Sequence, residues 1–310
     1  MIETPQSTFN SAGRASEDIA NLFYWMSGGA VAIWLIVIGL AVYAIYQPGP
    51  HHPRTTKLLV IGGGAVFPTV VLTGLLCYSL PMLPDLQRPA PTGSLQIHVS
   101  GVLWWWRIEY IGEDGQTFAT ANEIRLPVDQ PVEFKLHSED VIHSFWIPSL
   151  GGKVDMIPGR QTRLQLHPTR VGTYRGACAE FCGTAHAQMN FDVVVMPVDE
   201  FNDWLIAQRK DAKPPQESVA IEGQRQFLKH GCSACHTIRG TDAQGKVGPD
   251  LTHVGSRVSL GAGILKNGPE NLARWITQTH KVKPGVEMPE FDSLSDDDLK
   301  SMVAYLEQLK

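Results

Sequence analysis

The chain has 310 residues, which is long enough for two or roughly three domains. Its net charge of −5 is small, and no basic block or stripe points to nucleic-acid binding. Four of the five cysteines fall in two close pairs, Cys178 with Cys182 and Cys232 with Cys235, while Cys77 lies alone in an apolar run. This pattern indicates two cofactor sites rather than a disulfide framework.

Residues 1–21 are polar and of mixed charge, which predicts a loose tail outside any membrane. The tail has no basic start followed by a short apolar core, so we expect no cleaved secretion signal. Residues 22–92 are predicted to form a transmembrane hairpin with a proline-rich stalk. Its two uncharged runs, about 26–46 and 58–80, are each long enough to cross a ~30 Å hydrocarbon core as a helix.

The turn between the two runs carries Arg54 and Lys57. Since basic residues favour the cytoplasmic side, we expect the turn inside and both termini outside. This orientation predicts a multi-pass membrane protein with its soluble domains on the outer face. His51 and His52 in the same turn are expected to be solvated rather than metal ligands.

Residues 93–210 contain short alternating runs separated by Gly and Pro, which predicts an all-β sandwich or barrel. A short helix over 198–210, capped by Asp199, is expected to close it. Residues 211–216 are a proline-containing linker.

Residues 217–310 have helical periodicity, with helices expected near 221–228, over 271–278 and from Ser295 onward. Ser295 is expected to cap the last helix, and the acids 296–298 suit the positive end of its dipole better than a metal site. Met302 is expected in the core.

The most informative stretch runs from Cys178 to Met189 and places two thiols, the imidazole of His186 and a thioether within twelve residues. Sulfur ligands beside histidine favour copper, zinc or iron–sulfur centres. A disulfide between Cys178 and Cys182 leaves the other two side chains unexplained, and methionine is a poor zinc ligand. A mononuclear blue-copper site uses one cysteine, whereas two thiolates can bridge two coppers.

These residues, with His143 upstream, resemble the dinuclear copper A site of cytochrome c oxidase subunit II. The resemblance implies bridging thiolates at Cys178 and Cys182, terminal imidazoles at His143 and His186, and a weak thioether ligand at Met189. It also implies that the backbone carbonyl of Glu180 binds copper. The Glu180 side chain would then face a magnesium or manganese ion shared with the catalytic subunit.

The aromatic segment 103–110 also matches the family, in which a tryptophan lies on the electron entry route. By register with the family we expect Trp104 to be the entry residue and Trp106 its neighbour. The alternative is an aromatic core strand, and strand alternation places some of these rings inside in any case.

Cys232-Ser233-Ala234-Cys235-His236 is the attachment signature of a c-type haem, with Cys232 and Cys235 as the covalent sites and His236 as the proximal iron ligand. A thioredoxin-like pair is less suitable, because no βαβ pattern surrounds it. Met288, in a proline-bounded loop, is the expected second axial ligand. His230, His253 and His280 are the alternatives.

The pattern around Gly248–Leu251 and the Met288–Pro289 pair resemble class I cytochrome c. The whole chain therefore resembles oxidase subunit II with a fused cytochrome c, as in caa-type bacterial oxidases. The implied architecture is a two-helix hairpin, a cupredoxin-like β domain over 93–210 and an all-α cytochrome domain over 217–310. Many family members have a glutamate near the second span that feeds a proton channel, and residues 53–59 have none.

The resemblance implies an electron-input subunit of an oxidoreductase. Electrons would enter at haem c, pass to copper A and leave for a catalytic haem-copper subunit that reduces oxygen to water with proton pumping. The expected partners are subunit I, subunit III and a donor, either cytochrome c or a quinol-oxidising complex. Two alternatives remain: the copper A subunit of a nitric oxide reductase, and a non-enzymatic membrane copper-binding protein.

Overall fold

The computed structural model describes residues 6–46, 49, 52–81, 88–112 and 115–310. The chain divides into two compact units, one over Asp18–Arg88 and the other formed by Met1–Glu17 with Pro89–Lys310. His51 and part of the predicted proline-rich stalk lie outside the described residues.

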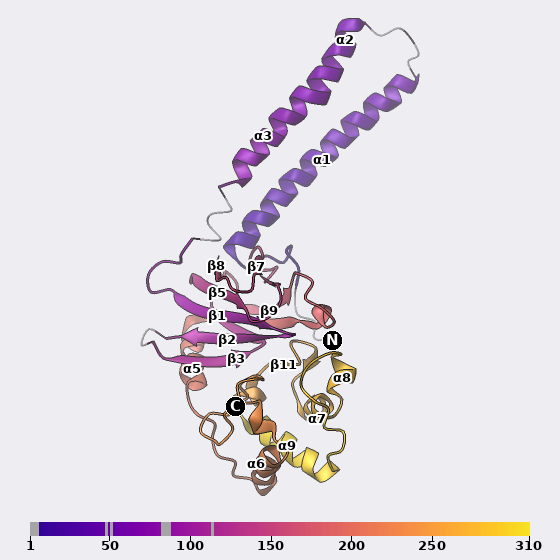
Figure 1. Cartoon of the computed structure of the whole chain (residues 1–310). Coiled ribbons are helices and arrows are strands. Elements are labelled where there is room, and N and C mark those ends of the chain that lie inside the picture. Colours follow the sequence, from indigo (N-terminus) through magenta and orange to yellow (C-terminus); the bar gives the residue numbers. More distant parts are fainter. Residues whose placement is uncertain (1–5, 47–48, 50–51, 82–87, 113–114) are drawn as a thin grey trace. The chain divides into compact units, whose positions relative to one another are not determined.

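The first unit contains most of one long helical run and all of a second (Figure 1). The first run is α1 (Arg14–Tyr46), and the second joins α2 (Pro53–Lys57), η1 (Leu58–Val66) and α3 (Phe67–Ser79). Both runs are long and apolar enough to cross a membrane. η1 is a π-helix that contains Gly62–Gly64, and such wider turns occur inside α-helices as local bulges.

The amino-terminal segment differs from the predicted loose tail. α1 begins at Arg14 rather than near residue 26, and Ala12 and Ser16 just at its start are fully buried. The Ser16 hydroxyl donates to the Ser149 carbonyl over 2.7 Å, and the Arg14 amide donates to the His167 carbonyl over 3.1 Å. The prediction was wrong because these small residues pack against a part of the chain far away in sequence.

The second unit contains two five-stranded sheets. One has the order β3 (Thr117–Ala121), β2 (Trp105–Ile111), β1 (Leu95–Val102), β5 (Val132–Ser138) and β8 (Thr162–Leu166). The other has the order β4 (Glu123–Pro127), β10 (Asn190–Met196), β9 (Gly172–Cys178), β6 (His143–Trp146) and β7 (Val154–Met156).

The sheets enclose an aromatic core. Trp106 lies 5.2 Å from Phe191 and 5.8 Å from Phe145 between ring centroids, and all three are fully buried. Alternation along β1 and β2 places every second side chain in this core. The expected sandwich therefore forms, and its interior is filled by rings.

The pairing of β6 with β9 brings together two segments far apart in sequence. Phe145 lies opposite Cys178 in an antiparallel register. The turn η2 (His186–Gln188) then lies in the loop between β9 and β10. His143 and the stretch from Cys178 to Met189 therefore meet at one end of the second sheet.

The expected closing helix is α5 (Val198–Gln208), but its cap is not Asp199. Pro197 occupies the cap position without a side-chain hydrogen bond, and Asp199 lies in the first turn. There a carboxylate still interacts favourably with the helix dipole.

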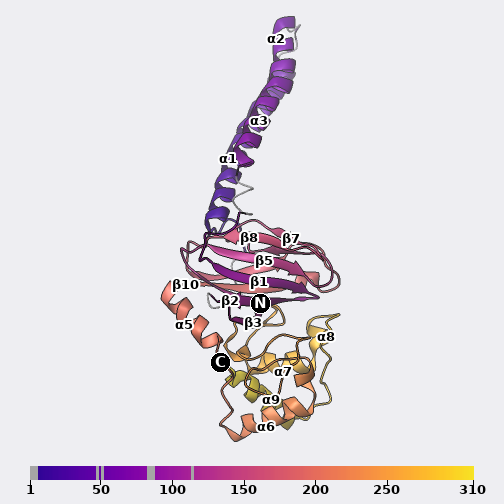
Figure 2. The ribbon, with the colours of Figure 1, turned by 60° about the vertical axis from the view of Figure 1, so that its left-hand side comes forward.

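The carboxy-terminal part of the unit is mainly helical (Figure 2). It contains α6 (Ser218–Lys229), η3 (Cys232–Ala234), η4 (Val254–Ser256), the short pair β11 (Ser259–Leu260) and β12 (Leu265–Lys266), α7 (Pro269–Thr277), α8 (Thr279–Val282) and α9 (Asp296–Gln308).

Helices α6 and α9 pack together around Phe227, Tyr305 and Leu306. The predicted cap of α9 is confirmed, since the Ser295 hydroxyl accepts a hydrogen bond from the Asp298 amide at 3.2 Å. Met302 is buried in this core, as expected.

Candidate functional site

Two buried thiols form the centre of the first site. The Sγ atoms of Cys178, at the end of β9, and Cys182, in the following loop, are 3.8 Å apart. A disulfide needs ~2.0 Å, so the disulfide alternative does not hold in this structure. Because a metal–thiolate bond is ~2.3 Å, a single ion can reach both sulfurs at this separation.

Each thiol has its own imidazole. His143 Nδ1 lies 3.8 Å from Cys178 Sγ, and His186 Nδ1 lies 3.5 Å from Cys182 Sγ. The Met189 sulfur is 3.8 Å from Cys182 Sγ and is fully buried. This set of soft sulfur and imidazole donors fits a dinuclear copper centre and does not fit hard cations.

The imidazole of His143 is held from two sides. Its Nε2 lies 2.7 Å from Asp140 Oδ1, which leaves Nδ1 directed at the thiol. A Cβ atom added to Gly101 would lie 2.6 Å from the His143 ring, so this close approach requires a glycine. Such carboxylate–histidine contacts orient metal ligands in proteins.

The two thiols differ in acidity because they interact with each other. The contact with the Cys182 side chain lowers the pKa of Cys178, against the opposing effect of burial. The same contact, with burial, raises the pKa of Cys182. The carbonyl oxygen of Glu180 also faces Cys178 Sγ at 3.2 Å, while the Glu180 side chain is half-buried. The two thiols are therefore unequal in acidity, and a bound cation would favour the thiolate form of both.

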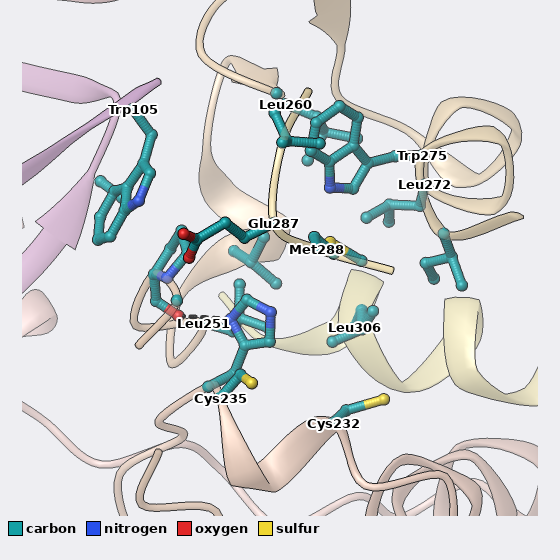
Figure 3. A pocket seen from close by; sticks show the side chains of 18 of the residues that line it. Trp105, Cys232, Cys235, Leu251, Leu260, Leu272, Trp275, Glu287, Met288 and Leu306 are labelled. Atoms are coloured by element: carbon teal, nitrogen blue, oxygen red, sulfur yellow. Dashed lines mark hydrogen bonds between the residues drawn. The ribbon is translucent and has the colours of Figure 1, made fainter. Parts of the chain in front are cut away.

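The second site is a cavity of about 450 Å³ in the helical part, with a mostly apolar lining. Cys232, Cys235, His236 and Met288 all line it. Figure 3 shows that Met288 and the two cysteines reach the cavity from different segments of the chain. The structure therefore brings all four predicted haem-binding residues to one cavity.

The local geometry of His236 suits an iron ligand. Its Nδ1 lies 2.8 Å from the Pro249 carbonyl, so Nδ1 carries the proton and Nε2 keeps its lone pair. A Cβ atom on Gly248 would lie 2.6 Å from the ring, so the glycine makes room for it. Burial lowers the pKa of His236, against the hydrogen bond to Pro249, and the neutral ring is the form that binds a metal.

The alternative axial histidines are less well placed. His253 Nε2 and His280 Nε2 each lie 3.1 Å from a backbone carbonyl, that of Lys210 and that of Val286 respectively. Neither residue belongs to the cavity lining, whereas His230 does. Of the four candidate second ligands, Met288 and His230 line the cavity.

A buried arginine provides a separate test of whether haem fits. Arg257 lines the cavity, and its Nε has no hydrogen-bond partner among the residues that the structure describes. Burial lowers the pKa of its guanidinium. An anionic carboxylate of haem would supply the missing acceptor, so the cavity suits haem in both shape and charge.

The aromatic segment forms part of the cavity wall. Leu103, Trp104 and Trp105 line the cavity, together with Ala121 and Asn122 from the same β domain. The Trp104 indole nitrogen also donates to the Cys182 carbonyl over 2.8 Å. Trp104 therefore contacts both sites, whereas Trp106 lies in the core, 6.2 Å from the His143 ring.

Sequence reasoning missed Gly101, Asp140 and Arg257 as parts of these sites. The role of Asp140 could have been predicted, because a carboxylate three residues before a predicted histidine ligand can reach that histidine and orient it. No neighbouring residues in the sequence predict the roles of Gly101 and Arg257, because each comes close to its site only in the folded chain.

The fold and the two sites define a class: a membrane-associated electron-transfer protein with a thiolate–imidazole metal centre and a c-type haem domain. The family model for cytochrome c oxidase subunit II, periplasmic domain, matches residues 113–198, and that for cytochrome c matches residues 220–310.

Three known proteins show the extent of the similarity. Cytochrome c oxidase subunit 2 of Alkalihalophilus pseudofirmus is 36% identical, over 70% of this chain and 62% of its own length. The Bacillus subtilis protein of the same name is 31% identical, over 79% of this chain and 70% of its own. The crystal structure of the periplasmic domain of subunit II of the Bradyrhizobium japonicum cytochrome oxidase is 28% identical, with a TM-score of 0.36, over 39% of this chain and 97% of that one.

The chain belongs to the cytochrome c oxidase subunit II family and carries a fused cytochrome c domain. Membership makes it a subunit of an oxidoreductase. The subunit II domain implies copper A and the cytochrome domain implies haem c, and the residues of both sites fit these groups.

Proposed function

We propose that this chain is the electron-input subunit of a respiratory terminal oxidase. The supporting observation is that Trp104 lines the haem cavity and also hydrogen bonds to Cys182, between the two candidate sites. Haem c and copper A would each supply a one-electron carrier. Electrons would enter the chain at the first, pass to the second and leave for the haem centres of a catalytic subunit I.

The proposed ligands are those that meet in the structure. Cys178, Cys182, His143, His186 and Met189 would hold copper, with the Glu180 carbonyl beside Cys178. Cys232 and Cys235 would attach the haem, and His236 and Met288 would bind its iron. His/Met ligation raises a haem potential, as suits a donor to copper. The magnesium or manganese ion at the Glu180 side chain stays a prediction from the family resemblance.

Oxygen reduction would take place in a partner. From Met26 to Tyr46 the first span contains no Asp, Glu, Lys, Arg or His, so it offers no intramembrane site for that chemistry. We propose subunit I as the acceptor, with subunit III as a further partner. The donor would be a cytochrome c or a quinol-oxidising complex, and proton pumping would belong to the whole complex.

The proposed topology is a plasma-membrane hairpin with Arg54 and Lys57, which lie in α2 at the start of the second helical run, on the cytoplasmic side and both termini outside. The two soluble domains would then share the outer face. Fusion replaces a diffusional encounter between donor and copper by a tethered one at high effective concentration.

The test is purification of the complex through this chain. We expect a large haem-containing membrane subunit to copurify, and oxygen uptake when haem c is reduced. Uptake of nitric oxide instead of oxygen would support the reductase alternative. A purified chain with exchangeable copper and no covalent haem would support the copper-binding alternative.

A further inference from the structure

A buried lysine links the copper loop to the haem loop. Lys283 immediately follows α8 and precedes the loop that carries Met288. Its residue is only 2% exposed, which is unusual for a lysine. Lys283 also lines the cavity assigned to haem, but its ammonium donates to backbone carbonyls and contacts neither a predicted copper ligand nor a predicted haem ligand.

The ammonium is fully hydrogen bonded. Nζ donates to the backbone carbonyls of Trp104 at 2.6 Å, Gln188 at 2.9 Å and Gly261 at 3.1 Å. An ammonium has three donors, so all of them are used. The first two acceptors belong to the β domain and the third to the helical domain. The lysine therefore joins the two domains through the backbone.

The contacts around Lys283 are reciprocal. The Gln188 side-chain amide donates to the Val282 carbonyl over 3.1 Å, next to the lysine. On the other side of the lysine, a Cβ atom on Gly285 would lie 3.1 Å from the Trp104 ring, so the indole packs on the backbone of the Met288 loop. Gln188 directly precedes Met189, and Trp104 hydrogen bonds to Cys182. Lys283 thus hydrogen bonds to two residues beside predicted copper ligands: Trp104, which contacts Cys182, and Gln188, which precedes Met189.

Keeping the Lys283 ammonium charged at this buried position costs free energy, because the charge is removed from water. Burial lowers the pKa of Lys283 to about 7. A buried ammonium persists only where hydrogen bonds replace water, as the three carbonyls do here. An apolar residue of the same length would fill the space but would leave the three carbonyls without this donor, so the contact is specific rather than merely space-filling.

We infer that Lys283 is a positioning residue that holds the Met288 loop against the copper loop and so keeps the two domains in the geometry for electron transfer between them. The electron-transfer part of this inference rests on the proposed function, whereas the docking part does not.

Two backbone amides report on docking directly. The Asn190 amide donates to the Ala262 carbonyl over 3.2 Å, and the Val258 amide donates to Glu123 Oε2 over 2.6 Å. Each hydrogen bond crosses between the two domains, so its amide exchanges with solvent when the domains separate. The Cys178 amide, bonded to the Met189 carbonyl within the copper domain, serves as an internal reference.

The experiment compares Lys283→Met with Lys281→Met in the intact, haem- and copper-loaded chain. Lys281 is an exposed lysine two residues away. For Lys283→Met we expect exchange at Asn190 and Val258 to rise about tenfold or more, since hydrogen bonds to a charged group are lost. We also expect haem-to-copper transfer to slow and to depend on solvent viscosity, with unchanged spectra of both centres. Lys281→Met should behave like the wild type.

The inference is overturned if Lys283→Met leaves exchange and transfer at wild-type values, or if it removes the copper signal or changes the ligation of the haem iron, which would give the residue a role inside a site. If this variant does not fold, Gln188→Met removes only the reciprocal hydrogen bond and should produce a smaller increase at the same two amides; no increase would also overturn it. Absence of haem-to-copper transfer in the wild type would reject the proposed function, while the exchange data would still test docking.

Discussion

The indole nitrogen of Trp104 donates a hydrogen bond of 2.8 Å to the backbone carbonyl of Cys182, one of the two central thiol residues. The same ring lines the haem cavity and packs on the backbone of Gly285. A single side chain thus connects the wall of one site to the ligand loop of the other.

Trp104→Phe is expected to slow haem-to-copper electron transfer several-fold while both centres still load. The phenyl ring retains much of the packing but cannot donate to Cys182. Flash-induced transfer within the purified chain measures the rate. Trp105→Phe is the matched control, because Trp105 also lines the cavity but has no hydrogen bond to the copper loop among the described contacts. Equal rates in both variants would remove Trp104 from the route.

Met288→Leu is expected to change the haem ligation and lower its midpoint potential, because a thioether ligand stabilises the reduced iron. Absorption spectra and a redox titration of the chain measure both. Met302→Leu is the control, since Met302 lines the same cavity from α9, and such a volume-conserving change costs less than about 1.5 kcal/mol. An unchanged spectrum in Met288→Leu would point to His230 as the ligand.

Cys178→Ser is expected to abolish the dinuclear copper signal. The hydroxyl is a poor bridging ligand, and Cys178 lies within 3.8 Å of both His143 Nδ1 and Cys182 Sγ. Metal analysis together with electron paramagnetic resonance measures the outcome. Cys77→Ser should leave the signal unchanged, because Cys77 lies in α3 of the hairpin unit. Retention of the signal in Cys178→Ser would rule out a bridging role.

Asp140→Asn is expected to weaken copper binding by about 10–100-fold, as is typical when a group that orients a ligand is removed. Asp140 Oδ1 faces His143 Nε2, and its Oδ2 accepts from the Leu103 amide over 2.8 Å. Competition with a copper chelator measures the affinity. Asp155→Asn, at an exposed position on the neighbouring strand β7, should have no effect. Equal affinities for the two variants would contradict the orienting role.

Asp192→Asn is expected to stabilise the intact chain at pH 7. Burial raises the pKa of Asp192 above 3.8, although the Ser259 hydroxyl donates to it. The protonated carboxyl therefore contributes stability below pH 3.8, and this contribution is lost as pH rises through the folded pKa.

The thermal midpoint of Asp192→Asn should exceed that of the wild type at pH 7, and the difference should shrink toward pH 4. Asp203→Asn, on the exposed side of α5, should show no such trend. A wild type that is more stable than Asp192→Asn at pH 7 would show that the charged carboxylate is favourable there.

The cofactor sites at the two cysteine pairs could be predicted from the sequence, because most of the ligands of each site lie close together along the chain. Cys232, Cys235 and His236 adjoin in sequence, and the stretch from Cys178 to Met189 holds four soft donors in a single loop. Hydropathy likewise predicted both apolar helices. His143 is different, since only the pairing of β6 with β9 brings it to Cys178, and it was placed by resemblance.

Other features depend on packing between distant segments. Alternation predicted that some tryptophans point inward, and Trp106 in β2 does fill the core, whereas Trp104 lies in the connection between β1 and β2 and reaches the cavity wall. The amino-terminal segment was expected to be loose, and it is ordered by the carbonyls of Ser149 and His167.

Residue type and short spacing were thus sufficient for the hairpin, for the kinds of ligand at each site and for the order of the domains. Lys283 marks the limit of that reasoning: in sequence it is an ordinary charged residue before a proline. Its burial against Trp104, Gln188 and Gly261 arises only when two domains fold against each other. Ligand chemistry belongs to the residue itself, whereas desolvation and hydrogen bonding across domains belong to the folded chain.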